Sequence, residues 1–242
     1  MIIAIVNQHS SPERTVVARN LAVRRAQSGR RVCLMTSAGN GDSDWAEERR
    51  HAGVQPWTET HQAGSRAVKM RLAALRPLFD DILIDAGTRD TDGCRCVLEE
   101  SRLVVVPVRG SALALDLQYR LLARLNGART FNPAMRMLFV AVSAAAGPGV
   151  SERAAVLARV ARVDDATLAE TVLHAPAAPD YGPGRCVPDA VTCDPDAAAE
   201  LRALYHEVYP AAVPVPFAVP AQIRHQKFST RRMSRQPQEK SR

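Results

Sequence analysis

The first 31 residues constrain the fold more than any other stretch of the chain. Residues 2–6 form an uninterrupted apolar run, a short polar segment covers residues 7–13, and a helical pattern then continues to Gly29. This order predicts a buried strand, a tight loop and a helix, which together make the first unit of an α/β protein. In such a unit, the loop and the amino end of the helix lie at the carboxyl edge of the sheet, where backbone N–H groups and the helix dipole favour phosphate.

The residues of this loop differ from those that a phosphate loop needs. A loop of the form G-x-x-x-x-G-K-[ST] uses glycines to curl its backbone, a lysine for the phosphates and a hydroxyl for Mg²⁺. Here only the hydroxyl, on Thr15, is retained; Ser10 and Ser11 stand where glycines are needed, and Arg14 stands in the lysine position. Glu13 adds a negative charge beside the phosphate position, which costs on the order of 1 kcal/mol or more. Ordinary nucleotide binding is therefore not expected.

Short apolar strands alternate with helical segments along the rest of the chain. Strands are predicted at residues 32–35, 82–84, 103–108, 137–142 and 171–174, and helices at residues 14–28, 63–75, 94–100, 112–126 and 196–208. Continuous apolar strands indicate burial on both faces, as in parallel sheets. The pattern predicts a doubly wound, mainly parallel α/β sheet with helices on both faces, in one domain over residues 1–209. Residues 46–60 show no clear period and are predicted to be a surface excursion.

Several segments resemble the ParA/MinD family of partition ATPases, in the family's order. The matching segments are residues 2–8, 17–22 and 30–35, the strand at 79–85, the strand S-R-L-V-V-V-P-V at 101–108, the helix at 112–125 and the closing helix at 197–204. The resemblance covers roughly residues 1–209. It implies a P-loop NTPase-like fold and a role in DNA partition or cellular positioning.

The differences from the family lie at the positions of its nucleotide-binding and catalytic residues. Carried over by position, the family's signature lysine is His9, its phosphate-loop lysine is Arg14 and its magnesium hydroxyl is Thr15. The acidic motif after the second strand is replaced, with Thr36 at its first aspartate position, whereas Asp85 retains its carboxylate. The resemblance thus implies a residual nucleotide and Mg²⁺ site at Arg14, Thr15 and Asp85, with no catalytic residue.

The tail differs in composition from the domain. Residues 210–220 are interrupted by four prolines, which is typical of an extended linker. Residues 224–242 have a net charge of +6, against +7 for the whole chain. Such a tail can bind DNA or anionic lipid without sequence preference, and the alternative is a solvated terminus. The candidate DNA-binding residues are Arg224, Lys227, Arg231, Arg232 and Arg235.

Composition narrows the classes of protein to which the chain can belong. A length of 242 residues with 46% hydrophobic residues suits one α/β domain with a sizeable core. The five cysteines form no CxxC pair, which argues against a disulfide framework and against a zinc site. No run of 18 apolar residues and no secretory leader pattern is present, so we expect a cytoplasmic protein without a transmembrane segment. No metal and no cofactor is expected.

Three functions remain open. The first is a pseudo-ATPase that acts as a scaffold or regulator of a partition or positioning system, with a partner protein and with DNA contacts through its tail. The second is a slow or partner-activated ATPase that holds Mg-ATP through Arg14, Thr15 and Asp85. The third is a pure protein-interaction module.

Two further possibilities follow from the same residues. The resemblance suggests a homodimer, which should not depend on nucleotide because His9 replaces the lysine that reaches across the family's dimer. A hydrolase built from His9, Ser10 or Ser11, and Asp85 is disfavoured because the loop has no strained G-x-S-x-G elbow.

Overall fold

The computed structural model describes most of the domain and none of the tail. The described residues are 1–7, 12–36, 42–64, 66–86, 92–109, 115–143, 150–174, 182–189 and 194–210. Residues Met1–Pro210 form one unit of dense internal contacts. The five candidate DNA-binding residues of the tail, and His9, Ser10 and Ser11 in the first loop, lie outside the described residues.

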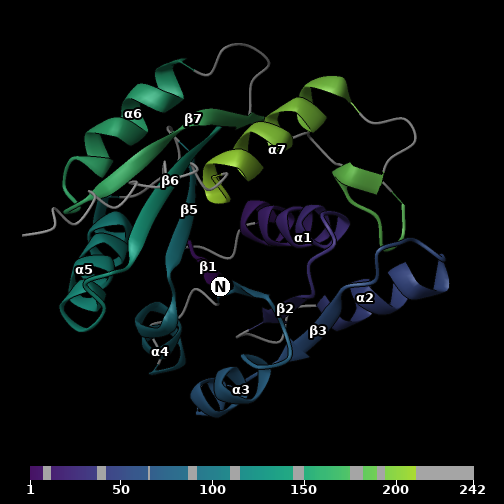
Figure 1. The fold of residues 1–242 in the computed structure, drawn as a ribbon. Coiled ribbons are helices and arrows are strands. Elements are labelled where there is room, and N and C mark those ends of the chain that lie inside the picture. The colour runs from purple at the N-terminus through teal and green to yellow at the C-terminus, as the bar shows by residue number, and fades with distance from the viewer. Residues whose placement is uncertain are drawn as a thin grey trace, which may run out of the picture. The chain divides into compact units, whose positions relative to one another are not determined.

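A seven-stranded sheet forms the centre of the domain (Figure 1), and all its pairings are parallel. The order is β3-β2-β4-β1-β5-β6-β7, so the chain winds outward from β1 in both directions. The strands are β1 (Ile2–Ile5), β2 (Val32–Thr36), β3 (Glu59–Gln62), β4 (Asp81–Asp85), β5 (Leu103–Arg109), β6 (Arg136–Ser143) and β7 (Ala166–His174). This topology confirms the predicted doubly wound α/β fold.

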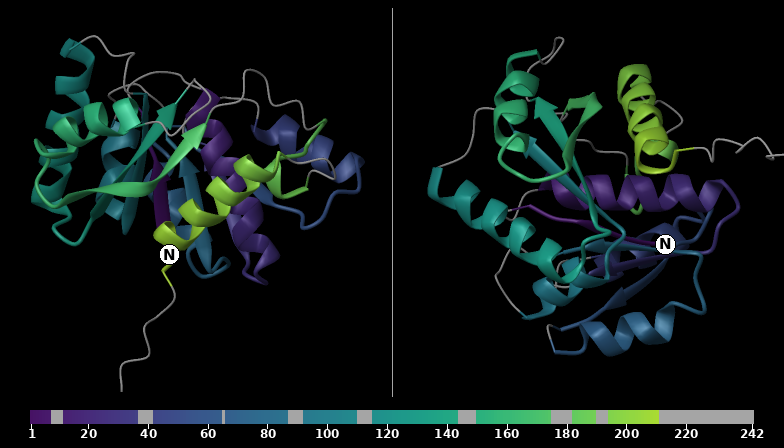
Figure 2. Two further views of the ribbon diagram at one scale, coloured as in Figure 1. Left: turned by 90° about the horizontal axis from the view of Figure 1, so that it is seen from above. Right: turned by 60° about the vertical axis from the view of Figure 1, so that its left-hand side comes forward.

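Helices cover both faces of the sheet (Figure 2). One face packs against α1 (Pro12–Gln27), α2 (Asp42–His51) and α7 (Pro195–Val208), and the other against α3 (Val68–Leu75), α4 (Asp92–Glu100), α5 (Leu115–Phe131) and α6 (Val150–Val160). A short 3₁₀ turn, η1 (Val187–Asp189), precedes α7. Adjacent residues of the central strands alternate between the two cores, because side chains alternate across a strand.

Helix α1 is fixed against the sheet by the apolar stripe that its sequence predicts. Val17, Ala18, Leu21 and Ala22 are all buried in the same core as the alternate residues of β1. The two alanines leave no bulk between helix and sheet, so the amino end of α1 is held close to the carboxyl ends of β1 and β4. This packing positions the candidate site.

The prediction for residues 46–60 was wrong. This stretch contains most of α2 and the start of β3, and Trp45 at the start of α2 is only 4% exposed. Strand β3 reads E-T-H-Q and is polar because it lies at the edge of the sheet, which removes the apolar signal of a buried strand. The helix expected from residue 63 begins only at Val68, because Ala63 still donates a backbone hydrogen bond to Thr36 of β2.

Two further observations concern the described part of the chain. None of its helices combines the length and apolar character needed to span a membrane. Within it, Cys33, Cys94, Cys96 and Cys186 form no disulfide, and it contains no group of three or more metal-binding side chains.

Candidate functional site at the carboxyl edge of the sheet

Four strand ends and one helix start meet at the candidate site. Asp85 is the last residue of β4 and lies in register with Ile5 of β1 and with Thr36 of β2. Arg109 is the last residue of β5, on the other side of β1. Because all the strands are parallel, these ends share one edge, and α1 begins at that edge with Pro12.

Asp85 accepts hydrogen bonds from the two residues that the sequence analysis placed beside it. Arg14 donates its Nε–H to Oδ1 of Asp85, and Thr15 donates its hydroxyl to Oδ2 at 2.6 Å. Arg14 is 1% exposed and Asp85 is fully buried. The structure therefore brings Arg14, Thr15 and Asp85 together. Their side chains are hydrogen-bonded to one another.

The electrostatics of this group follow from its burial. An isolated charge in this position would lose its hydration, so the guanidinium and the carboxylate depend on each other for compensation. One polar atom is left over, because Nη1 of Arg14 is buried and has no hydrogen-bond partner in the described part of the chain. This N–H is the single uncompensated donor of the group.

A second ion pair lies at the same edge. Glu13, in the first turn of α1, accepts a hydrogen bond from Nη2 of Arg109 at the end of β5. Nearby, the side-chain amide of Asn7 donates to the carbonyl of Pro107 at 3.0 Å, which ties the start of the first loop to β5. Sequence reasoning missed the partner of Glu13 because 96 residues separate it from Arg109, and the only available signal was the need for a nearby cation.

Thr36 takes the position next to Asp85 in the sheet. It is 1% exposed, and it stands where the resemblance would place an aspartate. The edge formed by the described residues therefore holds one carboxylate at the end of β4 and none at the end of β2.

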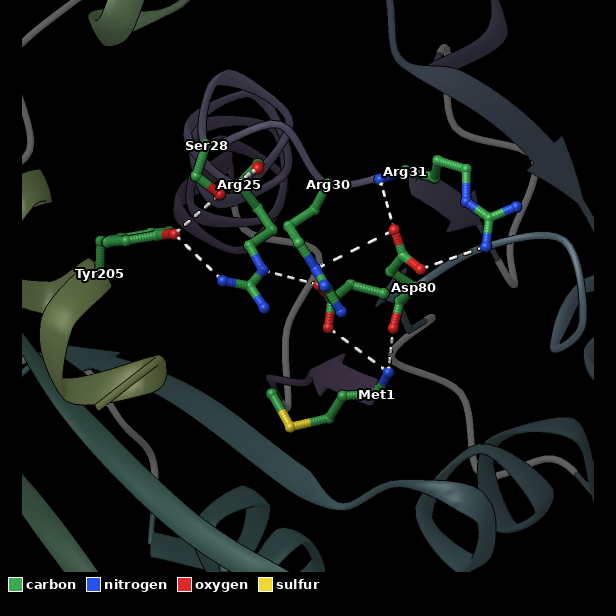
Figure 3. Close-up of polar contacts among 8 residues, drawn as sticks. Met1, Arg25, Ser28, Arg30, Arg31, Asp80 and Tyr205 are labelled. Carbon is green, nitrogen blue, oxygen red and sulfur yellow. Dashed lines mark hydrogen bonds and ion pairs between the residues drawn. The ribbon is translucent and has the colours of Figure 1, made fainter. Parts of the chain in front are cut away.

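The opposite edge of the sheet holds a similar but larger charge cluster (Figure 3). Asp81, the first residue of β4, accepts a hydrogen bond at 2.6 Å from Nε of Arg25, near the end of α1, and the same guanidinium donates to the Tyr205 hydroxyl at 3.3 Å. The amino group of Met1 and the guanidinium of Arg30 lie 3.4 Å and 3.7 Å from the carboxylate of Asp81. Here several partly exposed cations share one buried carboxylate.

Asp80 belongs to the same amino-edge cluster. It accepts hydrogen bonds from the side chain of Arg31 at 3.2 Å and from its backbone N–H at 2.9 Å. These bonds, mainly the side-chain one, lower the pKa of Asp80 to about 2, and the nearby charge of Arg30 adds to the effect.

The domain is a doubly wound α/β protein with an all-parallel sheet, and comparison with known proteins finds solved structures of similar fold. No family model and no curated protein matches the sequence. The septum site-determining protein MinD of Pyrococcus horikoshii OT3, complexed with Mg-ADP, has a similar structure with a TM-score of 0.60, 15% identity and coverage of 86% of this chain and 96% of that chain.

Two other solved structures are similar to a comparable degree. Cobyrinic acid a,c-diamide synthase of Mycobacterium smegmatis, with a bound ATP analogue and magnesium, has a TM-score of 0.59, 17% identity and coverage of 86% of this chain and 93% of that chain. A plasmid partition protein of Borrelia burgdorferi has a TM-score of 0.58, 12% identity and coverage of 86% and 97%. At these identities the comparisons establish the fold, which is the fold that the ParA/MinD resemblance implied.

Proposed function

We propose that this protein is a non-hydrolysing relative of the partition and positioning ATPases, acting as a scaffold or regulator whose basic tail contacts DNA. The proposal rests on one observation above all, the buried group formed by Arg14, Thr15 and Asp85. The protein has a fold similar to those of MinD and of a plasmid partition protein, and this similarity supports a role in positioning or partition.

The hydrogen bonds of this group oppose the use of Mg-ATP. In a phosphate loop the basic residue faces the phosphates and the hydroxyl binds Mg²⁺. Here Arg14 and Thr15 both donate to Asp85, so the guanidinium neutralises the carboxylate that Mg²⁺ would otherwise face. Glu13 adds a carboxylate at the start of α1, where the helix dipole would otherwise favour an anionic ligand. These residues do not fit Mg-ATP in the usual arrangement.

Calorimetric titration of the full chain with Mg²⁺ and a non-hydrolysable ATP analogue tests the first part of the proposal. We expect no saturable heat at millimolar nucleotide. The matched control carries the family's loop through the substitutions His9→Lys, Ser10→Gly, Ser11→Gly, Glu13→Gly and Arg14→Lys, and we expect it to gain affinity. Saturable Mg²⁺-dependent binding to the natural protein would overturn the proposal.

One observation favours the second candidate, a slow or partner-activated ATPase. The orphaned Nη1 of Arg14 is a buried cationic donor with no partner in the described residues, and an anion would satisfy it. Binding of the nucleotide analogue that is lost in Arg14→Met and kept in Arg109→Met would support this candidate.

DNA binding through the tail is the second part of the proposal. Residues 224–242 carry a net charge of +6, so binding should be independent of sequence and should weaken steeply with salt. We expect fluorescence anisotropy with a short DNA duplex to show affinity that falls by at least about tenfold between about 50 and about 200 mM salt. Deletion of residues 224–242 should abolish it. If the deletion leaves DNA affinity unchanged, the interaction-module alternative is favoured instead.

A further inference from the structure

Helix α3 presents two apolar surfaces, of which the sheet covers only one. Val68, Leu72 and Leu75 face the core and are buried. A second set recurs at helical spacing on the opposite side and is exposed, with Met70 at 73% and Leu78 at 56% exposure. We call this set the α3 outer stripe; it consists of Met70, Ala73, Ala74, Pro77 and Leu78, all of them exposed.

Two large side chains stand at the ends of the stripe, Met70 within α3 and Leu78 in the turn that follows it, and two alanines lie between them. Small residues at the centre of a helix face let another helix approach closely, while the large ones pack beside it. The helix lies at the end of its layer beside α4 (Figure 1), and the exposed residues of the stripe are open to a partner.

The charged residues of the segment that carries the stripe are all basic. Arg66, Lys69, Arg71 and Arg76 lie in or beside α3, and no acidic residue occurs from Thr60 to Phe79. By helical spacing, Lys69 and Arg76 flank one side of the stripe and Arg71 flanks the other. Arg66, Lys69 and Arg71 are exposed and form no ion pair with the residues that the structure describes, whereas Arg76 pairs with Glu100. A second copy of this helix would bring like charges together, which disfavours self-association through this face.

A hollow opens where the stripe ends. Its volume is about 360 Å³, and Arg76 and Phe79, which bracket Pro77 and Leu78 in the sequence, both line it. The rest of its lining combines apolar and charged residues, namely Met1, Ile2, Ile82, Glu100 and Arg102. Arg102 is exposed and forms no ion pair with other described residues. The hollow can therefore take an apolar side chain whose neighbour is acidic.

We propose that the α3 outer stripe and this hollow are the docking surface for an acidic amphipathic helix of a partner protein. The partner helix would lay its apolar face over the two alanines, place carboxylates beside Lys69 and Arg71, and insert one large apolar side chain into the hollow. An anionic membrane is the less suitable occupant, because only two large apolar side chains stand out from a two-turn helix, too few for stable insertion. The surface lies away from the candidate nucleotide site, so the inference does not depend on the proposed function.

A designed peptide serves as the probe. It is a fluorescein-labelled helix of about 18 residues, long enough to be helical, with leucines at i, i+3, i+4 and i+7 and glutamates on both flanks. A second peptide has lysine at every glutamate position. We expect the full chain to bind the acidic peptide in anisotropy titrations and to bind the lysine peptide at least about tenfold more weakly.

Variants locate the binding and exclude the basic tail as its source. The double substitution Met70→Glu/Leu78→Glu should weaken binding of the acidic peptide at least about tenfold, and Lys69→Glu/Arg71→Glu should reverse the preference between the two peptides. The matched control Leu157→Glu, at a leucine of α6 that is 51% exposed, should leave affinity unchanged. Circular dichroism melts check that each variant folds.

Three results would overturn the proposal. One is binding that survives Met70→Glu/Leu78→Glu, since the peptide would then be held elsewhere. Another is sedimentation with phosphatidylglycerol vesicles that depends on the stripe while the peptide does not bind, which would assign the surface to a membrane. The third is a dimer in analytical ultracentrifugation that Met70→Glu/Leu78→Glu dissociates, which would assign the surface to a second copy of the chain.

Discussion

The two ends of β4 carry the same chemistry and differ in how much water reaches it. At the carboxyl end, Asp85 is bonded to Arg14 at the start of α1; at the amino end, Asp81 is bonded to Arg25 near the end of the same helix. Arg14 is 1% exposed, whereas Arg25 is 21% exposed and shares Asp81 with Arg30 and the amino group of Met1. One pair is closed and the other is open to solvent.

The two pairs connect the same helix to the same strand. An arginine–aspartate pair at the amino edge joins α1 to β4 and needs no other role (Figure 3). The pair at the carboxyl edge joins the same two elements in the same way, so its geometry is that of a structural contact. On this view ion pairs hold α1 against β4 at both ends, and the candidate site contains one of these pairs.

Removing the buried carboxylate should have the largest effect. Asp85→Ala leaves the guanidinium of Arg14 buried without a counter-charge, which should lower the free energy of unfolding by about 3–5 kcal/mol. Urea denaturation followed by circular dichroism measures the loss. The exposed Glu47 of α2 provides the control, because Glu47→Ala should change stability by less than about 0.5 kcal/mol. A loss below about 1 kcal/mol for Asp85→Ala would mean that the carboxyl-edge pair is no structural contact.

The corresponding change at the other edge should cost less. Asp81→Ala should lower the free energy of unfolding by about 1–3 kcal/mol, because Arg25 and Arg30 are partly exposed and recover hydration when the carboxylate is removed. Parallel urea titrations of Asp81→Ala and Asp85→Ala give the ranking. Equal losses at the two positions would remove the distinction between a closed and an open pair.

Replacing both residues of an ion pair should reveal a further difference in stability between the carboxyl-edge pair and the amino-edge pair. Exchanging a buried ion pair for apolar side chains of similar volume often leaves stability unchanged. The free energy of unfolding of Arg14→Met/Asp85→Leu should therefore lie within about 2 kcal/mol of that of the natural protein. The matched double variant Arg25→Met/Asp81→Leu should recover less of its single-variant loss, because Arg30 and the amino group of Met1 lose their carboxylate. The same urea titrations measure both double variants. If the double variant at the carboxyl edge lost as much stability as its two single variants together, this prediction would be wrong.

The sequence predicted the sheet well where strands are buried and poorly at its edge. The apolar runs that became β1, β4, β5 and β6 were visible because both of their faces are covered. Strand β3 was missed because its edge position leaves it polar, and α2 was missed because its buried residues Trp45 and Ala46 stand within a charged sequence.

At the candidate site, the position of the residues could be predicted from the sequence, whereas their hydrogen bonds could not. Thr15 and Asp85 were expected at one edge from the strand–loop–helix pattern, and the structure has them 2.6 Å apart. That Arg14 turns to Asp85, and that Arg109 meets Glu13, depends on contacts across 71 and 96 residues, which local patterns do not encode. Whether this group holds any nucleotide stays a prediction.

The smallest expected effect concerns Asp80 at the open edge, and it is a pH dependence. The hydrogen bonds from Arg31 lower the pKa of Asp80 from 3.8 to about 2, so this carboxylate binds protons more readily in the unfolded chain than in the folded one. Its contribution to stability is therefore complete above about pH 4 and is lost as the pH falls toward 2. NMR titration should give a pKa for Asp80 near 2 in the natural protein, and Arg31→Gln should raise it toward 3.8. Arg50→Gln, at an exposed arginine of α2, should leave the pKa of Asp80 unchanged.

Because the pair of Asp80 and Arg31 is open to water, added salt should raise the pKa of Asp80 as well. A titration near 3.8 in the natural protein would show that the amino-edge hydrogen bonds of Arg31 are not maintained in solution.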